Sequence, residues 1–270
     1  MVLIREPAVA GSFYPSDPDE LRTAIQTLLD GAEVLPGPAP RALIVPHAGY
    51  IYSGSVAASA YAQLLPYRSR YRRVVLLGPA HRVPVSGLAL PGVELFKTPL
   101  GMVPVGKVAF DQLGRSAVTV NEAAHLEEHS LETQLPFLQV VLESFRLVPL
   151  LVGVTEPETV ARAIERLWRL EGTLIVVSTD LSHYLSYDDA GRRDGGTCNA
   201  IESLSPKHIG HTDACGCEAM KGLLTAARNC RMEVTTLDLR NSGDSAGMRD
   251  RVVGYGSWMF CDKVPCQNAA

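Results

Sequence analysis

Three short apolar runs, each followed by polar residues, constrain the fold of this chain more than any other feature of its sequence. They cover residues 42–45, 73–77 and 173–177, and helix-forming stretches separate them. Continuous apolar runs of this length predict strands that are buried on both faces. Strands that alternate with helices predict parallel pairing. We therefore expect an α/β fold in which helices flank a mostly parallel central sheet.

Polar side chains follow these predicted strands where each one ends. His47 and His81 come after the first two strands, Asp180 and His183 after the third, and Asp244 after a later strand at 233–239. One such histidine could equally be a hydrogen-bonded loop residue. Ligands bind open α/β sheets at the carboxyl ends of the strands, so the repetition favours one shared site there.

Composition and charge exclude several classes of function. The 270 residues are 46% hydrophobic, enough to build one α/β domain or two small ones. A net charge of −4 indicates no nucleic-acid partner, and the lack of a long apolar run indicates no membrane span. Arg5 and Glu6 interrupt any secretory leader, and no C-x-x-C pair is present. We therefore expect a cytoplasmic protein.

Two local patterns outside the strands predict further structure. Residues 85–105 are rich in Gly, Pro and Val, which predicts short antiparallel strands as an insertion beside the parallel sheet. Asp17 is placed to cap a helix whose first position is Pro18 and which ends at Gly31.

A helix is also predicted over residues 122–142, and it carries several ionisable side chains. His125 and His129 would share one face of it, as would Glu128 and Glu132. The spacing differs from the H-E-x-x-H pattern of zinc proteases. The group is either a polar helix face or, as we expect, Glu128, His129 and Glu132 project into the site.

The strand-end residues suit a divalent transition metal. Two histidines and one carboxylate with open positions form the ligand set of non-haem Fe(II) oxygenases, whereas zinc with a bound water would give a hydrolase. A histidine beside the metal would be a general acid/base. We assign that role to His183, with Asp180 orienting it or closing the pocket, and we add His129 to the candidate catalytic residues. No G-x-S-x-G, P-loop or G-x-G-x-x-G motif stands at a strand end.

Six segments carry a resemblance to a known family. The sequence resembles the Memo family, the AmmeMemoRadiSam system protein B group of bacteria and archaea. The resemblance implies a single Memo-like domain over residues 1–270, similar in fold to class III extradiol dioxygenases. The segments that carry it run in order along nearly the whole chain and cover residues 7–15, 46–54, 77–81, 128–138, 178–184 and 241–244.

The family resemblance also implies roles for individual residues. It implies metal ligands at His47 and His81 and an acid/base at His183. Animal relatives have a cysteine at the third ligand position, where this chain has Ser245. We therefore expect the neighbouring Asp244 to complete the ligand set. The implied cofactor is Fe(II), with Zn or Cu as alternatives, and the implied substrate is a small molecule, an aromatic one if the likeness to the dioxygenases extends to the substrate.

Three functions fit these residues. The first is a metal-dependent, non-haem iron oxidoreductase that resembles the extradiol dioxygenases. The second is a binding or adaptor module that keeps the pocket without turnover. For such a module the resemblance suggests AMMECR1-like and radical-SAM proteins as partners. The third is a zinc metallohydrolase, which would bind zinc rather than iron and act without oxygen.

Overall fold

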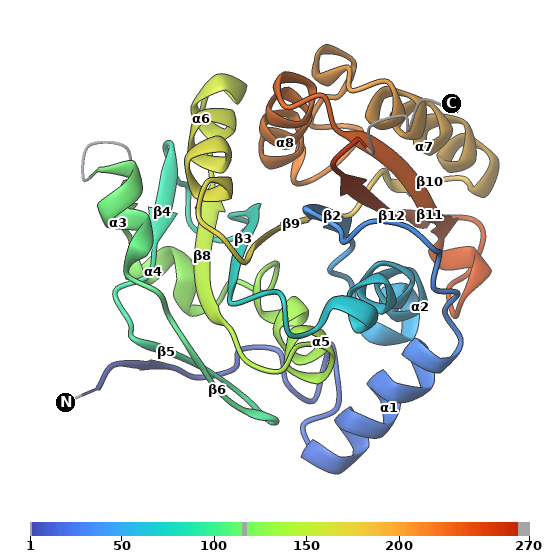
Figure 1. The fold of residues 1–270 in the computed structure, drawn as a ribbon. Helices are drawn as coiled ribbons and strands as arrows, with labels where there is room; N and C mark the ends of the chain where they lie inside the picture. The colour runs from blue at the N-terminus through green and yellow to red at the C-terminus, as the bar shows by residue number, and fades with distance from the viewer. Residues whose placement is uncertain (1, 115–117, 264–270) are drawn as a thin grey trace, which may run out of the picture.

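The computed structural model describes residues 2–114 and 118–263, and within them a nine-stranded sheet dominates the fold (Figure 1). Its strands lie in the order β10-β12-β2-β9-β3-β8-β4-β7, and β11 pairs with β12. A separate three-stranded sheet has the order β1-β5-β6. The strand bounds are β1 Ile4–Arg5, β2 Ala42–Val45, β3 Arg73–Pro79, β4 Leu88–Leu90, β5 Leu95–Thr98, β6 Gly101–Pro104, β7 Val118–Val120, β8 Arg146–Val152, β9 Thr173–Ser178, β10 His183–Leu185, β11 Glu233–Asn241 and β12 Val252–Cys261.

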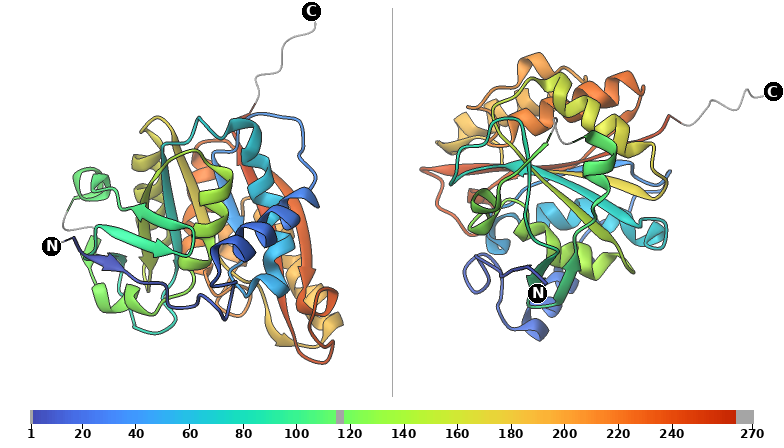
Figure 2. Two further views of the ribbon diagram at one scale, coloured as in Figure 1. Left: turned by 90° about the horizontal axis from the view of Figure 1, so that it is seen from below. Right: turned by 90° about the vertical axis from the view of Figure 1, so that its left-hand side faces the viewer.

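Helices pack on both faces of this sheet. Figure 2 shows α6, α7 and α8 on one face and α1, α2 and α5 on the other. The α-helix bounds are α1 Pro18–Asp30, α2 Tyr50–Tyr61, α3 Val108–Leu113, α4 Glu122–Leu126, α5 Leu135–Val141, α6 Pro157–Trp168, α7 Tyr187–Glu202 and α8 Cys217–Asn229. Short 3₁₀ helices are η1 Ala62–Tyr67, η2 Glu132–Gln134, η3 Pro206–His208 and η4 Ser242–Asp244.

The central strands β2, β9, β3 and β8 pair in parallel. The chain runs from β2 through α2 to β3, and from β8 through α6 to β9. In the strand order β2-β9-β3-β8, the first crossover connection runs toward β8 and the second runs back toward β2. Because such crossovers are right-handed, their helices lie on opposite faces. β9 therefore lies between β2 and β3 at the point where the winding reverses.

Alternate side chains of one strand face the two halves of the core. In β2, Ala42 and Ile44 pack with the helices on the α6 and α8 side, whereas Leu43 and Val45 pack with the α1 and α2 side. All four residues are fully buried. The alternation follows from the two-residue period of a strand. A strand covered by helices on both faces must therefore be apolar throughout, as the sequence predicted.

The α/β fold class is confirmed, and so is the antiparallel insertion. β5 and β6 pair antiparallel with each other, and β4 pairs antiparallel with β8 at one side of the parallel strands. On the other side, β12 pairs antiparallel with β2.

The predicted cap of the first helix is also confirmed. The Asp17 carboxylate accepts hydrogen bonds from the backbone N–H groups of Asp19 and Glu20, at 2.9 and 3.0 Å. Gly31 follows the last residue of α1. Within the ranges that the structure describes, no helix is both long enough and apolar enough to cross a bilayer.

The single helix predicted over residues 122–142 is wrong. The structure breaks it into α4, η2 and α5, with an irregular turn between Leu126 and Glu132. In this turn the Glu128 carboxylate accepts a hydrogen bond from the Ser130 backbone N–H, at 2.9 Å. Such side-chain bonds to nearby backbone groups compete with helical hydrogen bonds. His125 and His129 therefore do not share a helix face, and the His125 ring lies 3.0 Å from the Ala89 carbonyl oxygen.

Candidate metal site

Three neighbouring strands meet at the edge of the sheet where the candidate site lies. His47 follows β2 and His81 follows β3, while β9 pairs with both strands and ends at Ser178. Asp180 lies just beyond that end. The parallel direction of the three strands brings all of these residues to one edge, at the reversal point where open α/β sheets bind ligands.

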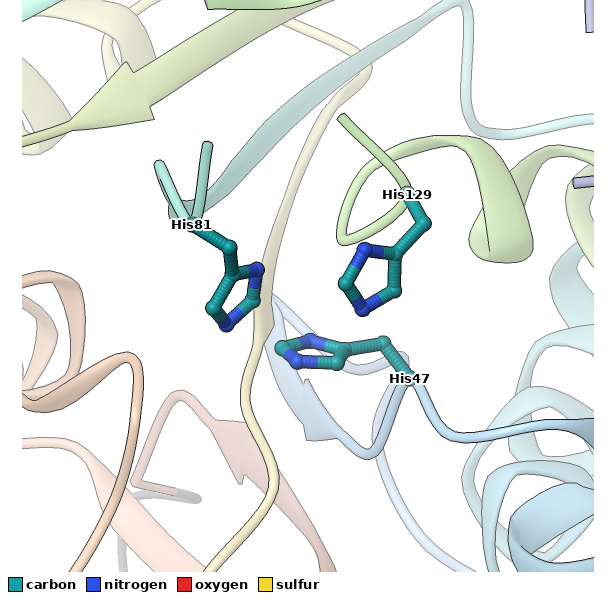
Figure 3. A group of neighbouring side chains, drawn as sticks. All are labelled: His47, His81 and His129. Carbon is teal, nitrogen blue, oxygen red and sulfur yellow. The ribbon is translucent and has the colours of Figure 1, made fainter. Parts of the chain in front are cut away.

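A third histidine joins His47 and His81 at this edge. It is His129, which the broken helix presents from the turn after α4. One ring nitrogen of each histidine lies within 4.8 Å of the others, and Figure 3 shows the three imidazoles facing a common space. The rings of His81 and His129 stack with centroids 4.8 Å apart, and His47 meets both edge-on at 5.2 and 5.4 Å.

Hydrogen bonds around Ser178 fix the tautomer of His47. The Ser178 hydroxyl donates its one proton to the Ser130 carbonyl, at 2.6 Å, and accepts a hydrogen bond from Gln134 Nε2 at 3.0 Å. His47 Nδ1 lies 2.9 Å from the same hydroxyl oxygen, so it must be the donor. The lone pair of His47 is therefore on Nε2, which makes this nitrogen available as a metal ligand.

Glu128 holds His81 in the same way. This buried carboxylate accepts hydrogen bonds from the His81 backbone N–H at 2.6 Å and from its Nδ1 at 2.9 Å. His129 Nδ1 lies 3.4 Å from the same carboxylate. Burial alone would raise the pKa of Glu128, but the hydrogen bonds and charge of His81 overcome it and lower that pKa to about 2. An ionised glutamate therefore lies behind the histidines.

His47 and His129 are suited to bind a metal because both have lowered pKa values and stay neutral. Burial, together with the charge of His81, lowers the pKa of His47 to about 3. Burial and the charge of His47 lower the pKa of His129 to about 4. Neutral imidazoles whose other nitrogen is anchored by a carboxylate or hydroxyl are typical metal ligands. The donor set therefore fits a divalent transition metal.

Asp180 and His183 lie beside this group. The buried Asp180 carboxylate accepts a hydrogen bond from the His47 backbone N–H at 2.7 Å, and its other oxygen lies 3.9 Å from His47 Nε2. Burial raises the pKa of Asp180, whereas the His47 hydrogen bond and the charge of His183 act in the opposite direction. His183 is exposed at the start of β10, next to Tyr184.

Asp244 lies apart from the three histidines in this structure. It is an exposed residue of η4, and it accepts hydrogen bonds from the Tyr187 hydroxyl at 2.5 Å and from the Asn241 backbone N–H at 3.0 Å. Ser245 follows it and bonds to the Ser242 carbonyl. In the part of the chain that the structure describes, the third possible metal ligand beside His47 and His81 is His129 and not Asp244.

Glu132 has a different role from the one expected. Its buried carboxylate faces the N-terminal segment and not the histidines. It binds the Arg5 guanidinium at 2.7 Å and accepts hydrogen bonds from the backbone N–H groups of Ala8 and Val9 and from the Tyr14 hydroxyl, at 2.8, 3.0 and 2.6 Å. This network fixes residues 5–14 against the turn that carries His129.

Four residues that support the site were not predicted from the sequence: Ser130, Ser178, Gln134 and Cys215. The first three lie in the segments that carry the family resemblance, and this position in the sequence could have marked them as candidates. Cys215 lies outside those segments, so no such sign was present for it. Its sulfur lies 3.3 Å from His47 Nε2, and because that nitrogen holds a lone pair, the thiol donates to it. Burial raises the pKa of Cys215 to about 12, so the thiol keeps its proton.

Fold and site together define an α/β protein with a histidine cluster at the carboxyl ends of its central parallel strands. The family model for Memo-like protein matches residues 5–259. The chain belongs to the Memo family. A MEMO1 family protein of Aquifex aeolicus is 35% identical over 270 residues, which cover 95% of this chain and 99% of the relative. One from Thermotoga neapolitana is 38% identical over 279 residues, covering 94% and 98%.

Proposed function

We propose that this protein is a metal-dependent oxidoreductase that holds non-haem Fe(II) on His47, His81 and His129. The observation that carries the proposal is the convergence of three imidazoles, of which His47 and His81 have Nδ1 hydrogen-bonded to a hydroxyl or carboxylate oxygen and His129 has Nδ1 at 3.4 Å from the same carboxylate as His81. Three protein ligands at one face of an ion leave positions open for substrate, and Fe(II) in such a site supplies the chemistry by which dioxygen reacts with an organic molecule. The family resemblance favours Fe(II) over zinc.

The residues around the histidines have separate roles in this proposal. Ser178 and Glu128 keep the rings oriented, so that binding requires no reorientation. His183 takes a proton from a substrate hydroxyl at one of its ring nitrogens, and Asp180 stabilises the imidazolium that forms. Phe13, whose ring lies 4.9 Å from that of His129, provides an apolar wall suited to a small aromatic substrate.

Metal analysis of protein purified without oxygen and loaded with Fe(II) tests the proposal. We expect near-stoichiometric iron in the native protein and a strong loss in His47→Ala and His81→Ala. His208→Ala is the matched control, because His208 is an exposed histidine of η3. Iron retained by the His47→Ala and His81→Ala variants would refute the site. Zinc binding with no oxygen consumption would refute the oxidoreductase and favour a hydrolase.

The third ligand is tested in the same experiment. We expect His129→Ala to lose iron and Asp244→Asn to keep it. The opposite result would return Asp244 to the ligand set, as the sequence predicted. Failure to bind any metal would leave the binding-module function, in which the pocket serves recognition alone.

A further inference from the structure

A second group of metal-ligating side chains lies at the start of α8, away from the three histidines. It consists of His211, in the turn before the helix, with Cys217 and Glu218 in its first turn. The Cys217 sulfur lies 3.1 Å from His211 Nδ1 and 3.6 Å from Glu218 Oε1. His211 Nε2 lies 3.4 Å from the same carboxylate oxygen.

A metal binds one nitrogen of an imidazole, so with His211 bound through Nδ1 the two distances from the Cys217 sulfur are edges of one tetrahedral site. Zinc binds sulfur, nitrogen and oxygen ligands at 2.0–2.3 Å, so neighbouring ligand atoms around it lie roughly 3.3–3.8 Å apart. The sulfur-to-oxygen distance of 3.6 Å falls in that range, and the sulfur-to-nitrogen distance of 3.1 Å needs only a small movement of the imidazole. Such a movement is open to His211, whose side chain is 75% exposed.

The surroundings leave room for a fourth ligand. His211 and Glu218 line a cavity of about 220 Å³, and Cys215 forms part of its wall. Three protein ligands with an open fourth position are typical of zinc sites that bind water or a small anion. The sulfur of Cys215 contacts His47, whereas that of Cys217 contacts His211, so the two residues of the C-x-C motif have different ring partners.

One member of this group, Glu218, already forms an ion pair with a lysine. Lys221 Nζ lies 3.2 Å from Glu218 Oε1, so its ammonium neutralises the carboxylate that a metal would use. The N-terminus of α8 disfavours a cation, but a thiolate and a carboxylate together offset that effect. A bound divalent ion deprotonates the thiol that coordinates it, which supplies the second negative charge.

We propose that His211, Cys217 and Glu218 form a second metal site, for Zn²⁺, separate from the three-histidine site. The set of thiolate, imidazole and carboxylate suits zinc better than the hard cations that prefer oxygen alone. A metal here displaces Lys221 from Glu218 and leaves one coordination position open to the cavity.

Cobalt substitution tests this site through a signal that only a thiolate ligand gives. We expect Co²⁺ added to the full-length protein to produce a near-ultraviolet sulfur-to-cobalt band that is lost in Cys217→Ser and kept in Cys215→Ser. The band should also persist in a His47→Ala/His81→Ala variant. No band in the native protein, or a band lost in Cys215→Ser and kept in Cys217→Ser, would overturn the proposal.

Zinc affinity gives a second test that does not alter a buried residue. We expect His211→Ala to weaken zinc binding at this site at least about 10-fold in the His47→Ala/His81→Ala background. His208→Ala, another exposed histidine nearby, should leave binding unchanged. Lys221→Met should tighten binding, since it removes the competitor for Glu218. Unchanged affinity in His211→Ala or weaker binding in Lys221→Met would refute the assignment.

Discussion

Replacing Glu132 by glutamine should destabilise the protein more than most single substitutions. The change keeps the size of the side chain but removes its charge. Glu132 is fully buried, and Arg5, its partner at 2.7 Å, is 2% exposed. The variant therefore leaves a buried guanidinium without its counter-charge. It also turns an amide NH₂ group toward N–H and O–H donors that need an acceptor.

The size of the effect follows from these contacts. Removing one partner of a buried ion pair destabilises a protein by about 3–5 kcal/mol. Arg5 keeps hydrogen bonds to the carbonyl oxygens of His125 and Glu128, at 2.7 and 2.6 Å, so part of its polar surface stays satisfied. We therefore expect Glu132→Gln to lower the free energy of unfolding by about 3 kcal/mol, at the lower end of that range.

Urea unfolding followed by circular dichroism and by fluorescence measures this loss. Tyr14→Phe removes one hydrogen bond to the same carboxylate and should cost about 2 kcal/mol. Glu127→Gln is the matched control, because Glu127 is an exposed glutamate of the same turn, and its effect should stay within about 0.5 kcal/mol. If Glu132→Gln unfolds at the same urea concentration as Glu127→Gln, the carboxylate does not anchor the N-terminal segment and our reasoning is wrong.

Three further predictions concern the histidines. Glu128→Gln should weaken metal binding about 10- to 100-fold, because it frees the His81 ring; unchanged affinity in a metal titration would contradict this. Ser178→Ala should weaken binding through His47, and Ser178→Thr, which keeps the hydroxyl, should restore it. Burial lowers the pKa of His125 to about 4, so the unfolded chain binds the extra proton and stability falls as pH drops below about 6.5. Between pH 7 and pH 5 the lowered pKa of His125 should cost the metal-free protein about 2 kcal/mol in free energy of unfolding. Urea titrations should therefore show a fall that is about 2 kcal/mol smaller in His125→Gln than in the native protein, and an equal fall would refute this role of His125.

The sequence predicted the sheet well because its central strands leave little choice. Runs such as residues 42–45 are buried on both faces, so every position must be apolar, and Pro46 then ends the strand. His47 and His81 could be placed together for the same reason, since parallel strands bring their ends to one edge.

The sequence placed His129 among the candidate catalytic residues, but its position as the third histidine of the cluster could not be derived in this way. The apolar spacing over residues 122–142 is compatible with one helix, and the spacing gives no sign that Glu128 breaks it. At the break, Glu128 accepts hydrogen bonds from the Ser130 backbone N–H and from the backbone N–H of His81, 47 residues earlier in the chain. Contacts between such distant residues leave no periodic signal. The position of Cys215 against His47 is a tertiary contact of the same kind.

The hydrogen bond from His47 to Ser178 has a consequence for the order of events during synthesis. The two residues are 131 positions apart, and the bond from His47 to Asp180 spans 133. While the ribosome is still translating the residues before β9, His47 has emerged but its anchor has not yet been made. The nascent chain therefore cannot form the ordered three-histidine site, and the metal that we propose for it can bind only after the strand that completes the site has been made and packed.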